Sequence, residues 1–147
     1  MTRALELLSR WASFLHSGVI LWLLFTGRLL SWSPWAWGPQ LAALALAVWA
    51  RAAFARGQFS VLPDPRQPRL IESGPYRWIR HPMYAAAEIV LWSGVLRHLS
   101  VATVAAGLCA LAVVIVRVRD EEARLRAGVP GYAEYARRTR RIVPFVF

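Results

Sequence analysis

Four apolar stretches alternate with polar, arginine-bearing segments along the 147-residue chain. They cover about residues 11–30, 39–55, 83–96 and 99–116, and the third is the weakest. Each is near or slightly below the ~20 residues that an α-helix needs to cross a bilayer. The pattern predicts an all-α, polytopic membrane protein with about four transmembrane helices.

A tight turn and a stop signal define the second half of this pattern. Only Arg97-His98-Leu99-Ser100 separates the last two stretches, so we expect an antiparallel helical hairpin with Ser100 as the N-cap of its second helix. The polar pattern then continues as helix to about residue 127, where Gly128-Val129-Pro130-Gly131 stops it. Residues 132–141 predict a short, amphipathic C-terminal helix.

Residues 57–75 form the longest interruption between apolar stretches. They contain four prolines, which exclude a continuous helix. We expect this segment to lie over the cytoplasmic ends of the helices, as a candidate lid.

Composition and charge place these helices in a membrane. The chain is 57% hydrophobic, and its net charge of +10 comes from 18 arginines, without lysine, against 8 acids. The arginines lie between and after the apolar segments, which favours lipid headgroups over nucleic acid as the anionic partner. With the N-terminus in the cytoplasm, sixteen arginines fall inside and only Arg28 and Arg97 outside. This asymmetry predicts an integral protein of the inner (cytoplasmic) membrane with both termini in the cytoplasm.

Cysteine usage excludes two kinds of site. The single Cys109 lies inside an apolar run, so neither a disulfide framework nor a cysteine-rich metal site can form. We predict no metal.

Residues 73–84 carry the most informative polar cluster. A turn signal leads through Tyr76, Arg80 and His81 directly into an apolar helix, with Pro82 suited to its first turn. A helix start beside Arg80 and His81 offers a site for a carboxylate or phosphate. The alternative is that the arginines only anchor the helix at the headgroups and that His81 is an interfacial residue.

Glu88 lies within the third apolar stretch, on the same predicted helix face as His81 and Tyr84. An ionisable group inside a membrane segment is costly unless it is paired or faces a polar cavity. Glu88 is therefore a functional candidate, with a structural pairing to an arginine as the alternative.

A second polar cluster follows the last apolar stretch. Asp120, Glu121 and Glu122 are three of the chain's eight acids, followed by Tyr132, Tyr135 and a run of arginines. The alternative for the acids is a solvated helix end with i,i+4 pairs such as Glu122 with Arg126. The alternative for the tail is a basic segment that binds headgroups.

These motifs occur in an ordered combination. Residues 74–77 read Gly-Pro-Tyr-Arg and residues 80–84 read Arg-His-Pro-x-Tyr, and after the hairpin residues 121–125 read Glu-Glu-x-x-Leu. Gly131-Tyr132 with Tyr135, Arg138 and Pro144 complete the order. Over residues 73–145 the chain closely resembles the isoprenylcysteine carboxyl methyltransferases and their phospholipid methyltransferase relatives.

The resemblance implies one membrane domain over residues 1–147, with two N-terminal transmembrane helices (1–56) and a methyltransferase-like catalytic core (57–147). It implies S-adenosylmethionine as cofactor and a lipophilic small molecule or lipid-linked substrate as acceptor, methylated at the cytoplasmic face. The implied catalytic residues are Arg80, Glu122 and Arg138. The implied cofactor-binding residues are Tyr76, His81, Pro82, Tyr84, Glu121, Tyr132 and Tyr135.

Two other functions fit parts of the sequence. A membrane sterol or steroid reductase using NADPH would place arginine, histidine and tyrosine at comparable helix ends. A non-catalytic adaptor would need only basic loops that bind anionic lipid. The chain contains no Gly-x-Gly-x-x-Gly, so a soluble nucleotide-binding enzyme has no support.

Overall fold

The computed structural model describes residues 3–30, 34–54 and 70–142, and over these residues it is helical with no strand. This confirms the all-α prediction. The predicted lid falls largely on residues 55–69, outside the described part. The helices are α1 (Arg3–Phe25), α2 (Pro34–Ala52), the 3-10 helix η1 (Gly74–Arg77), α3 (Pro82–Arg97), α4 (Val101–Gly128) and α5 (Tyr132–Arg138).

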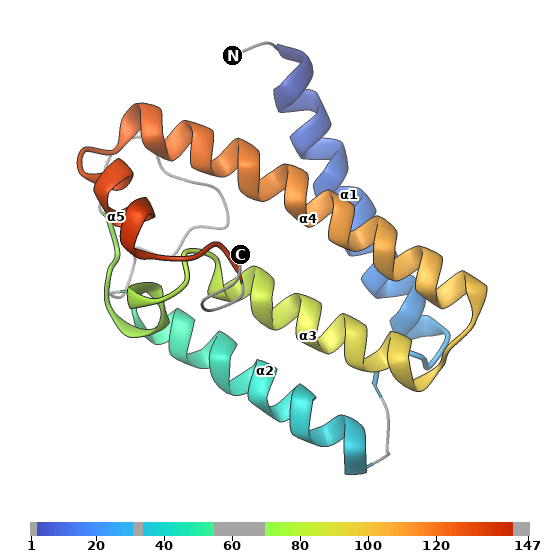
Figure 1. Ribbon diagram of the computed structural model, residues 1–147. Coiled ribbons are helices and arrows are strands. Elements are labelled where there is room, and N and C mark those ends of the chain that lie inside the picture. The colour runs from blue at the N-terminus through green and yellow to red at the C-terminus, as the bar shows by residue number, and fades with distance from the viewer. Residues whose placement is uncertain (1–2, 31–33, 55–69, 143–147) are drawn as a thin grey trace.

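The four long helices lie side by side (Figure 1), with α1 packed along α4 and α2 along α3. The start of α3, the end of α4 and the short elements η1 and α5 gather at one end of this bundle. We call it the polar end. The opposite end carries the α3–α4 turn and the end of α1.

The predicted hairpin and its local signals are confirmed. α3 ends at Arg97 and α4 begins at Val101. Ser100 Oγ accepts a hydrogen bond from the Thr103 N–H at 3.1 Å, and Thr103 Oγ1 accepts one from the Ser100 N–H at 3.0 Å. This reciprocal capping satisfies two backbone donors at the helix start. Pro82 occupies the first position of α3, as expected.

Two helices end earlier than the sequence predicts. α1 ends at Phe25 rather than near residue 30, because Gly27 adopts a φ of 67° and turns the chain. α5 ends at Arg138 rather than at residue 141. Beyond it, Arg140 forms a parallel bridge with Ile79, which requires extended backbone.

The prediction of four transmembrane helices is not confirmed. Among the described residues, only α4 is long and apolar enough to cross a membrane. α3 has 16 residues, and within the described residues of α1 the apolar segment is Phe14–Phe25. α2 has 19 residues, but Pro39 and Gln40 interrupt its apolar character. The structure therefore supports one candidate span packed among shorter apolar helices.

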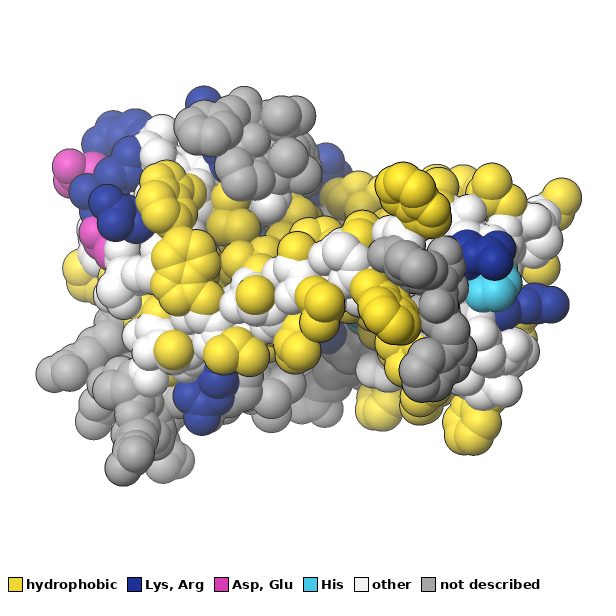
Figure 2. Space-filling model, turned by 90° about the horizontal axis from the view of Figure 1, so that it is seen from below, with side chains coloured by type: hydrophobic (Ala, Val, Ile, Leu, Met, Phe, Trp, Pro, Cys, Tyr) yellow, Lys and Arg dark blue, Asp and Glu magenta, His cyan; other side chains and the backbone are white. Residues whose placement is uncertain are grey.

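The surface remains strongly hydrophobic between the ends of the bundle. In Figure 2 apolar side chains run across the middle of one face, while charged side chains lie mainly toward its two ends. The most exposed large apolar side chains include Trp35 and Val101, each 90% exposed, and Phe25 at 86%. Such extensive apolar exposure is typical of a surface that contacts lipid or another protein.

Close packing fixes the end of the bundle opposite the polar end. Leu23 and Leu29 at the end of α1 pack on Leu91, Val95 and Ala110 of the hairpin. Gly94 makes the approach possible, because a Cβ there would lie 2.5 Å from the carbonyl oxygen of Arg28. A second apolar cluster fixes the polar end and consists of Ile79, Ala85, Val114, Val118 and Ile142.

Candidate functional site

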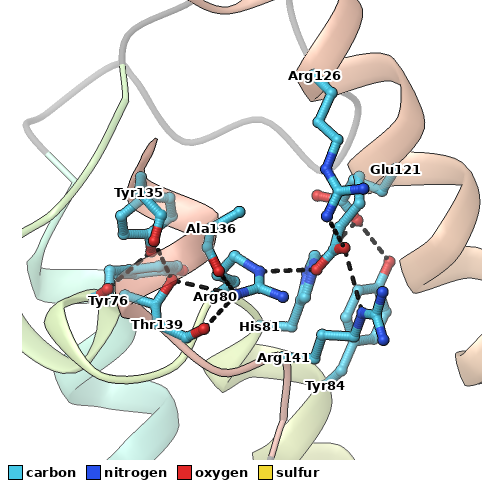
Figure 3. A network of polar contacts seen from close by, with 11 residues as sticks. Tyr76, Arg80, His81, Tyr84, Glu121, Arg126, Tyr135, Ala136, Thr139 and Arg141 are labelled. Carbon is cyan, nitrogen blue, oxygen red and sulfur yellow. Dashed lines mark hydrogen bonds and ion pairs between the residues drawn. The ribbon is translucent and has the colours of Figure 1, made fainter. Parts of the chain in front are cut away.

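A buried ion pair lies at the centre of the polar end (Figure 3). Arg80 Nε donates to Glu122 Oε1 at 2.7 Å, and the two side chains are 7% and 3% exposed. Arg80 Nη1 also donates to the carbonyl oxygens of Ala136, at 2.9 Å, and Thr139. Arg80 therefore joins the start of α3 to both α4 and the C-terminal segment.

Glu122 has further partners on its second oxygen. Oε2 accepts from Arg141 Nε at 3.2 Å and from Arg126 Nη2 at 3.5 Å. The predicted i,i+4 pair with Arg126 is confirmed, but the expected solvated helix end is wrong for Glu122, which is 2% exposed. Packing of α5 and the tail against the end of α4 removes this carboxylate from solvent. Three guanidinium groups compensate the free-energy cost of burying its negative charge.

Backbone hydrogen bonds attach the C-terminal segment to the start of α3. The N–H of Arg80 donates to the Arg140 carbonyl at 2.7 Å, and the N–H of His81 donates to the Arg141 carbonyl at 2.9 Å. In return the Arg140 N–H donates to the Trp78 carbonyl at 2.9 Å. The amides that precede the helix are thus already bonded, and an anion at this helix start cannot use them.

His81, Tyr84 and Glu121 form a more accessible group beside this ion pair. Tyr84 OH donates to Glu121 Oε2 at 3.3 Å and accepts from Arg117 Nε at 3.1 Å. His81 Nδ1 lies 4.0 Å from the same Glu121 oxygen. The Glu121 side chain is 31% exposed, whereas that of His81 is only 4% exposed. Of the two carboxylates that face His81, Glu121 is the one that a ligand can reach.

Three tyrosines surround the group from η1 and α5. Tyr135 OH donates to the Tyr76 carbonyl at 2.7 Å, which ties the two elements together. Burial and the negative charge of Glu121 raise the pKa of Tyr76 to about 12. Burial and the negative charge of Glu122 raise the pKa of Tyr132 to about 12, and burial also raises the pKa of Tyr135. All three therefore remain neutral hydrogen-bond donors at physiological pH.

Two buried polar atoms have no hydrogen-bond partner within the described part of the chain: Nε2 of His81 and OH of Tyr132. His81 Nε2 does lie 3.5 Å from Glu122 Oε1, an ion-pair distance for a protonated ring. A buried polar group without a hydrogen bond costs about 1–3 kcal/mol. Both atoms belong to residues that the family resemblance assigns to cofactor binding, which makes them candidate hydrogen-bonding groups for a ligand at this end.

The structure separates two candidates from this cluster. Arg138 pairs with Glu72 instead, and their side chains are 56% and 41% exposed. Glu88 lies away from the polar end and contacts His16 of α1 and Trp92, so the expected arginine partner is wrong. The remaining predicted residues of the site all gather at the polar end. Among the described residues no group of three or more potential ligands could hold a metal ion.

An apolar cavity of about 670 Å³ lies between α2, η1 and α3. Trp49, Trp78, Trp92 and Ile142 are among its walls, and within the described part of the chain Glu88 is the one charged residue of the lining. Ile79 and Ala85 line this cavity, and their chain neighbours Arg80 and Tyr84 belong to the polar cluster, so the cavity and the cluster are adjacent. A hydrophobic compartment thus adjoins a charged one.

Residues 41–127 match the family model described as isoprenylcysteine carboxyl methyltransferase (ICMT) family. The chain belongs to this family. The match covers more than half of the chain, from within α2 to the end of α4, and it includes both the Arg80–Glu122 pair and the Tyr84–Glu121 pair. No curated protein and no solved structure matches the chain.

Membership in the ICMT family supports a membrane methyltransferase that acts on a lipid-type acceptor. The candidate membrane span of α4 agrees with an integral membrane protein. Neither the reductase nor the adaptor that the sequence left open has comparable support. α5 and the tail lie beyond the matched residues, so their place at the site comes from the structure alone.

Sequence reasoning missed Thr139 and His16, which the structure brings into polar contacts, and it left open which of the tail arginines acts in the site: Arg137, Arg138, Arg140 or Arg141. The bridge between Ile79 and Arg140 brings the tail close to the ion pair, and with it Thr139 and Arg141. Thr139 is 2% exposed there. No local spacing signals that bridge. His16 could have been found, because an ionisable residue inside an apolar helix is a candidate by the same rule that selected Glu88.

Proposed function

We propose that this ICMT-family protein transfers a methyl group from S-adenosylmethionine to a lipophilic acceptor at the cytoplasmic face of the membrane. The observation that carries the proposal is the adjacency of two unlike compartments. A charged cluster with two unbonded buried polar atoms adjoins an apolar cavity of about 670 Å³. One suits a small zwitterionic cofactor and the other a hydrocarbon chain.

The charges of the polar end fit such a cofactor, which has a sulfonium, an ammonium and a carboxylate. Glu121 presents a reachable carboxylate to the cationic groups. Arg126 and Arg141 neutralise Glu122, yet their side chains remain 52% and 30% exposed. Arg126, the more exposed of the two, can therefore offer N–H groups to a carboxylate.

The unbonded donors complete the fit. His81 Nε2 and Tyr132 OH are buried against the same acids. Tyr84 OH already bridges Arg117 and Glu121, which fixes the position of that carboxylate. We therefore assign cofactor contacts to His81, Tyr84, Glu121 and Tyr132.

The other predicted site residues have supporting roles in this proposal. Arg80 and Glu122 are positioning residues, because their buried pair fixes α3, α4 and the C-terminal segment. Tyr76, Pro82 and Tyr135 shape the pocket wall through η1, the helix start and the η1–α5 hydrogen bond. The role of Arg138 near the reacting groups stays a prediction. Its place at the polar end, exposed and paired with Glu72, suits contact with a bound substrate from outside.

The bound cofactor supplies an electrophilic methyl group. The chain's residues contribute orientation and a water-poor environment, because methyl transfer needs the acceptor atom in line with the methyl–sulfur bond. The apolar walls at Ile79 and Ala85 keep bulk water from the boundary between the compartments. In this proposal, positioning of the reactants and exclusion of water are the two effects that accelerate methyl transfer.

The arginine distribution supports the cytoplasmic face. The polar end carries the arginines of α4, α5 and the start of α3, whereas Arg28 and Arg97 lie at the opposite end (Figure 1). By the positive-inside rule the polar end faces the cytoplasm, where S-adenosylmethionine is available.

Calorimetric titration of the purified protein in detergent with S-adenosylhomocysteine tests the proposal, with NADPH as the comparison ligand. We expect saturable binding of S-adenosylhomocysteine only. Glu121→Gln should weaken it about tenfold or more, since a charge-assisted hydrogen bond contributes roughly 1.5–3 kcal/mol. Glu134→Gln is the matched control, because Glu134 is an exposed acid of α5. Binding of NADPH instead, or equal affinity in both variants, would contradict the assignment.

A further inference from the structure

The cavity between α2, η1 and α3 has an exposed rim and a buried floor. Three of its lining residues are large apolar side chains that are also exposed: Trp49, Trp78 and Ile89. The buried lining residues include Ile79 and Ala85, which adjoin the polar cluster. The cavity is therefore open where the three exposed side chains lie, and its floor leads to the polar cluster.

Arg77 lies beside this rim, at the polar end of the molecule. Its guanidinium carbon is 4.7 Å from the centroid of the Trp78 ring, which is a cation–π distance. Trp78 in turn meets Trp49 edge to face, with the ring centroids 5.6 Å apart. The Arg77 side chain is exposed, and within the described residues the Trp78 ring is the one partner of its guanidinium.

The backbone around Arg77 is held without help from its side chain. The carbonyl of the preceding residue, Tyr76, accepts from Tyr135 OH at 2.7 Å. The carbonyl of the following residue, Trp78, accepts from the Arg140 N–H at 2.9 Å. The guanidinium is thus presented on a fixed segment, and its N–H groups are not needed to hold the fold.

A fixed guanidinium beside an indole suits an anion. A guanidinium over a ring uses its face, so the N–H donors in its plane remain available to a carboxylate or phosphate. The same segment continues through Ile79, which lines the cavity, to Arg80 of the polar cluster. An anion held by Arg77 would therefore lie on the side of the cavity that adjoins the proposed cofactor contacts.

We propose that Arg77 is a specificity residue at the rim of the acceptor cavity, which binds the anionic head of a lipophilic molecule whose apolar chain occupies the cavity. The inference rests on the proposed function, because it treats the cavity as the acceptor site. An arginine that only anchored η1 at the lipid headgroups would leave the choice of acceptor unchanged. The two roles therefore differ in what a substitution of Arg77 does to ligand selection.

Photo-crosslinking with three probes tests the selection. The probes share one alkyl chain with a diazirine and differ only in the head: carboxylate, alcohol or primary amine. The protein is placed in nanodiscs of zwitterionic lipid, and labelling of the peptides of α2 and α3 is measured by mass spectrometry. We expect the carboxylate to label about three- to fivefold more than the alcohol, with the amine lowest, because an exposed cation contributes a modest free energy.

Three variants separate the rim from the general charge of the protein. Arg77→Gln should abolish most of the carboxylate preference. Arg77→Lys keeps the charge but loses the planar guanidinium, so it should retain part of the preference. Arg119→Gln is the matched control, because it removes an exposed arginine of α4 and should keep the preference. Equal labelling by carboxylate and alcohol in the wild type, or the same preference in Arg77→Gln as in Arg119→Gln, would overturn the proposal.

Nanodiscs that contain anionic lipid distinguish the two sources of an anion, the acceptor and the membrane headgroups. We expect the carboxylate preference to persist in them, because the probe's chain is held in the cavity as well. Loss of the preference in these nanodiscs would assign Arg77 to the headgroups and overturn the proposal.

Titration of the same nanodisc samples with S-adenosylhomocysteine distinguishes this inference from the proposed function. Absence of the carboxylate preference in a wild type that binds S-adenosylhomocysteine overturns the role of Arg77 alone. Absence of cofactor binding in the folded wild type overturns methyl transfer, whatever the probes show.

Discussion

Glu122 and Glu88 are both buried carboxylates, yet their surroundings differ. Glu122 contacts three arginines and lies 3.5 Å from His81. Glu88 contacts one histidine and one indole and lies in the wall of an apolar cavity. The first carboxylate holds three chain segments together: the start of α3, the end of α4 and the C-terminal tail. The second carboxylate is held by neutral or titratable neighbours and has no guanidinium among its described partners.

The comparison separates two uses of buried charge. In a network of many hydrogen bonds and ion pairs, the interactions compensate the free-energy cost of desolvating the charges and fix the surrounding backbone. A carboxylate with two described contacts fixes less of the chain around it. Mutations in the network around Glu122 should therefore affect folding most, and mutations at the rim of the cavity should affect ligand choice.

Arg80→Met should have the largest effect on stability. It removes the main partner of Glu122 and the donors to the carbonyls of Ala136 and Thr139. We expect a loss of about 3–5 kcal/mol, the usual cost of removing one partner of a buried ion pair. Chemical denaturation in detergent measures it. Arg80→Lys keeps the positive charge but loses the planar guanidinium, which donates to several acceptors at once. It should therefore recover only part of the lost stability. A change below about 1 kcal/mol in Arg80→Met would contradict the role of this network.

Gly94→Ala tests the packing of the apolar body away from the polar network. The added methyl would meet the carbonyl oxygens of Arg28 and Leu29 at 2.5 and 2.8 Å. Because both are backbone atoms, the end of α1 must move, and we expect a loss of about 1–3 kcal/mol. Gly18→Ala is the matched control, since nothing lies within 4 Å of its added Cβ. It should be neutral or stabilising by thermal denaturation.

Tyr135→Phe and Tyr132→Phe distinguish a structural hydroxyl from a ligand-facing one. Tyr135→Phe removes the 2.7 Å hydrogen bond to the Tyr76 carbonyl and should cost about 1 kcal/mol. Tyr132→Phe removes a hydroxyl that has no partner in the described structure, so its stability should be almost unchanged. Calorimetry should instead show weaker binding of S-adenosylhomocysteine. Full binding by Tyr132→Phe would remove this residue from the proposed cofactor contacts.

The smallest expected effect is a pH dependence from the same tyrosine. Its pKa is about 12 in the folded protein against 10.0 as the ordinary value. The folded state holds the phenol proton more tightly, so this contribution to stability is complete below pH 10 and is lost as the pH rises toward 12. Melting temperatures measured across this range should fall less steeply for Tyr132→Phe than for the wild type. Parallel curves would show that Tyr132 does not contribute.

Local sequence signals predicted much of the helical frame. Pro82 at a helix start and Ser100 as an N-cap are confirmed, as is the stop at Gly128. Each depends on backbone preferences within about one turn, so a single sequence carries the information. The number of transmembrane helices was not obtained in this way, because length and hydropathy alone leave an apolar segment as short as the 16-residue α3 ambiguous.

The sequence by itself determined that Arg80 and Glu122 would lie at the same end of the molecule, because a short turn folds α3 and α4 into one hairpin. Only the tertiary structure decided that Arg141 rather than Arg138 reaches Glu122, and that Glu88 pairs with His16. Those contacts depend on the parallel bridge of the tail with Ile79 and on the packing of α1 against the hairpin. No periodicity or capping signal encodes such contacts, since they arise from the combined burial of segments far apart in the chain.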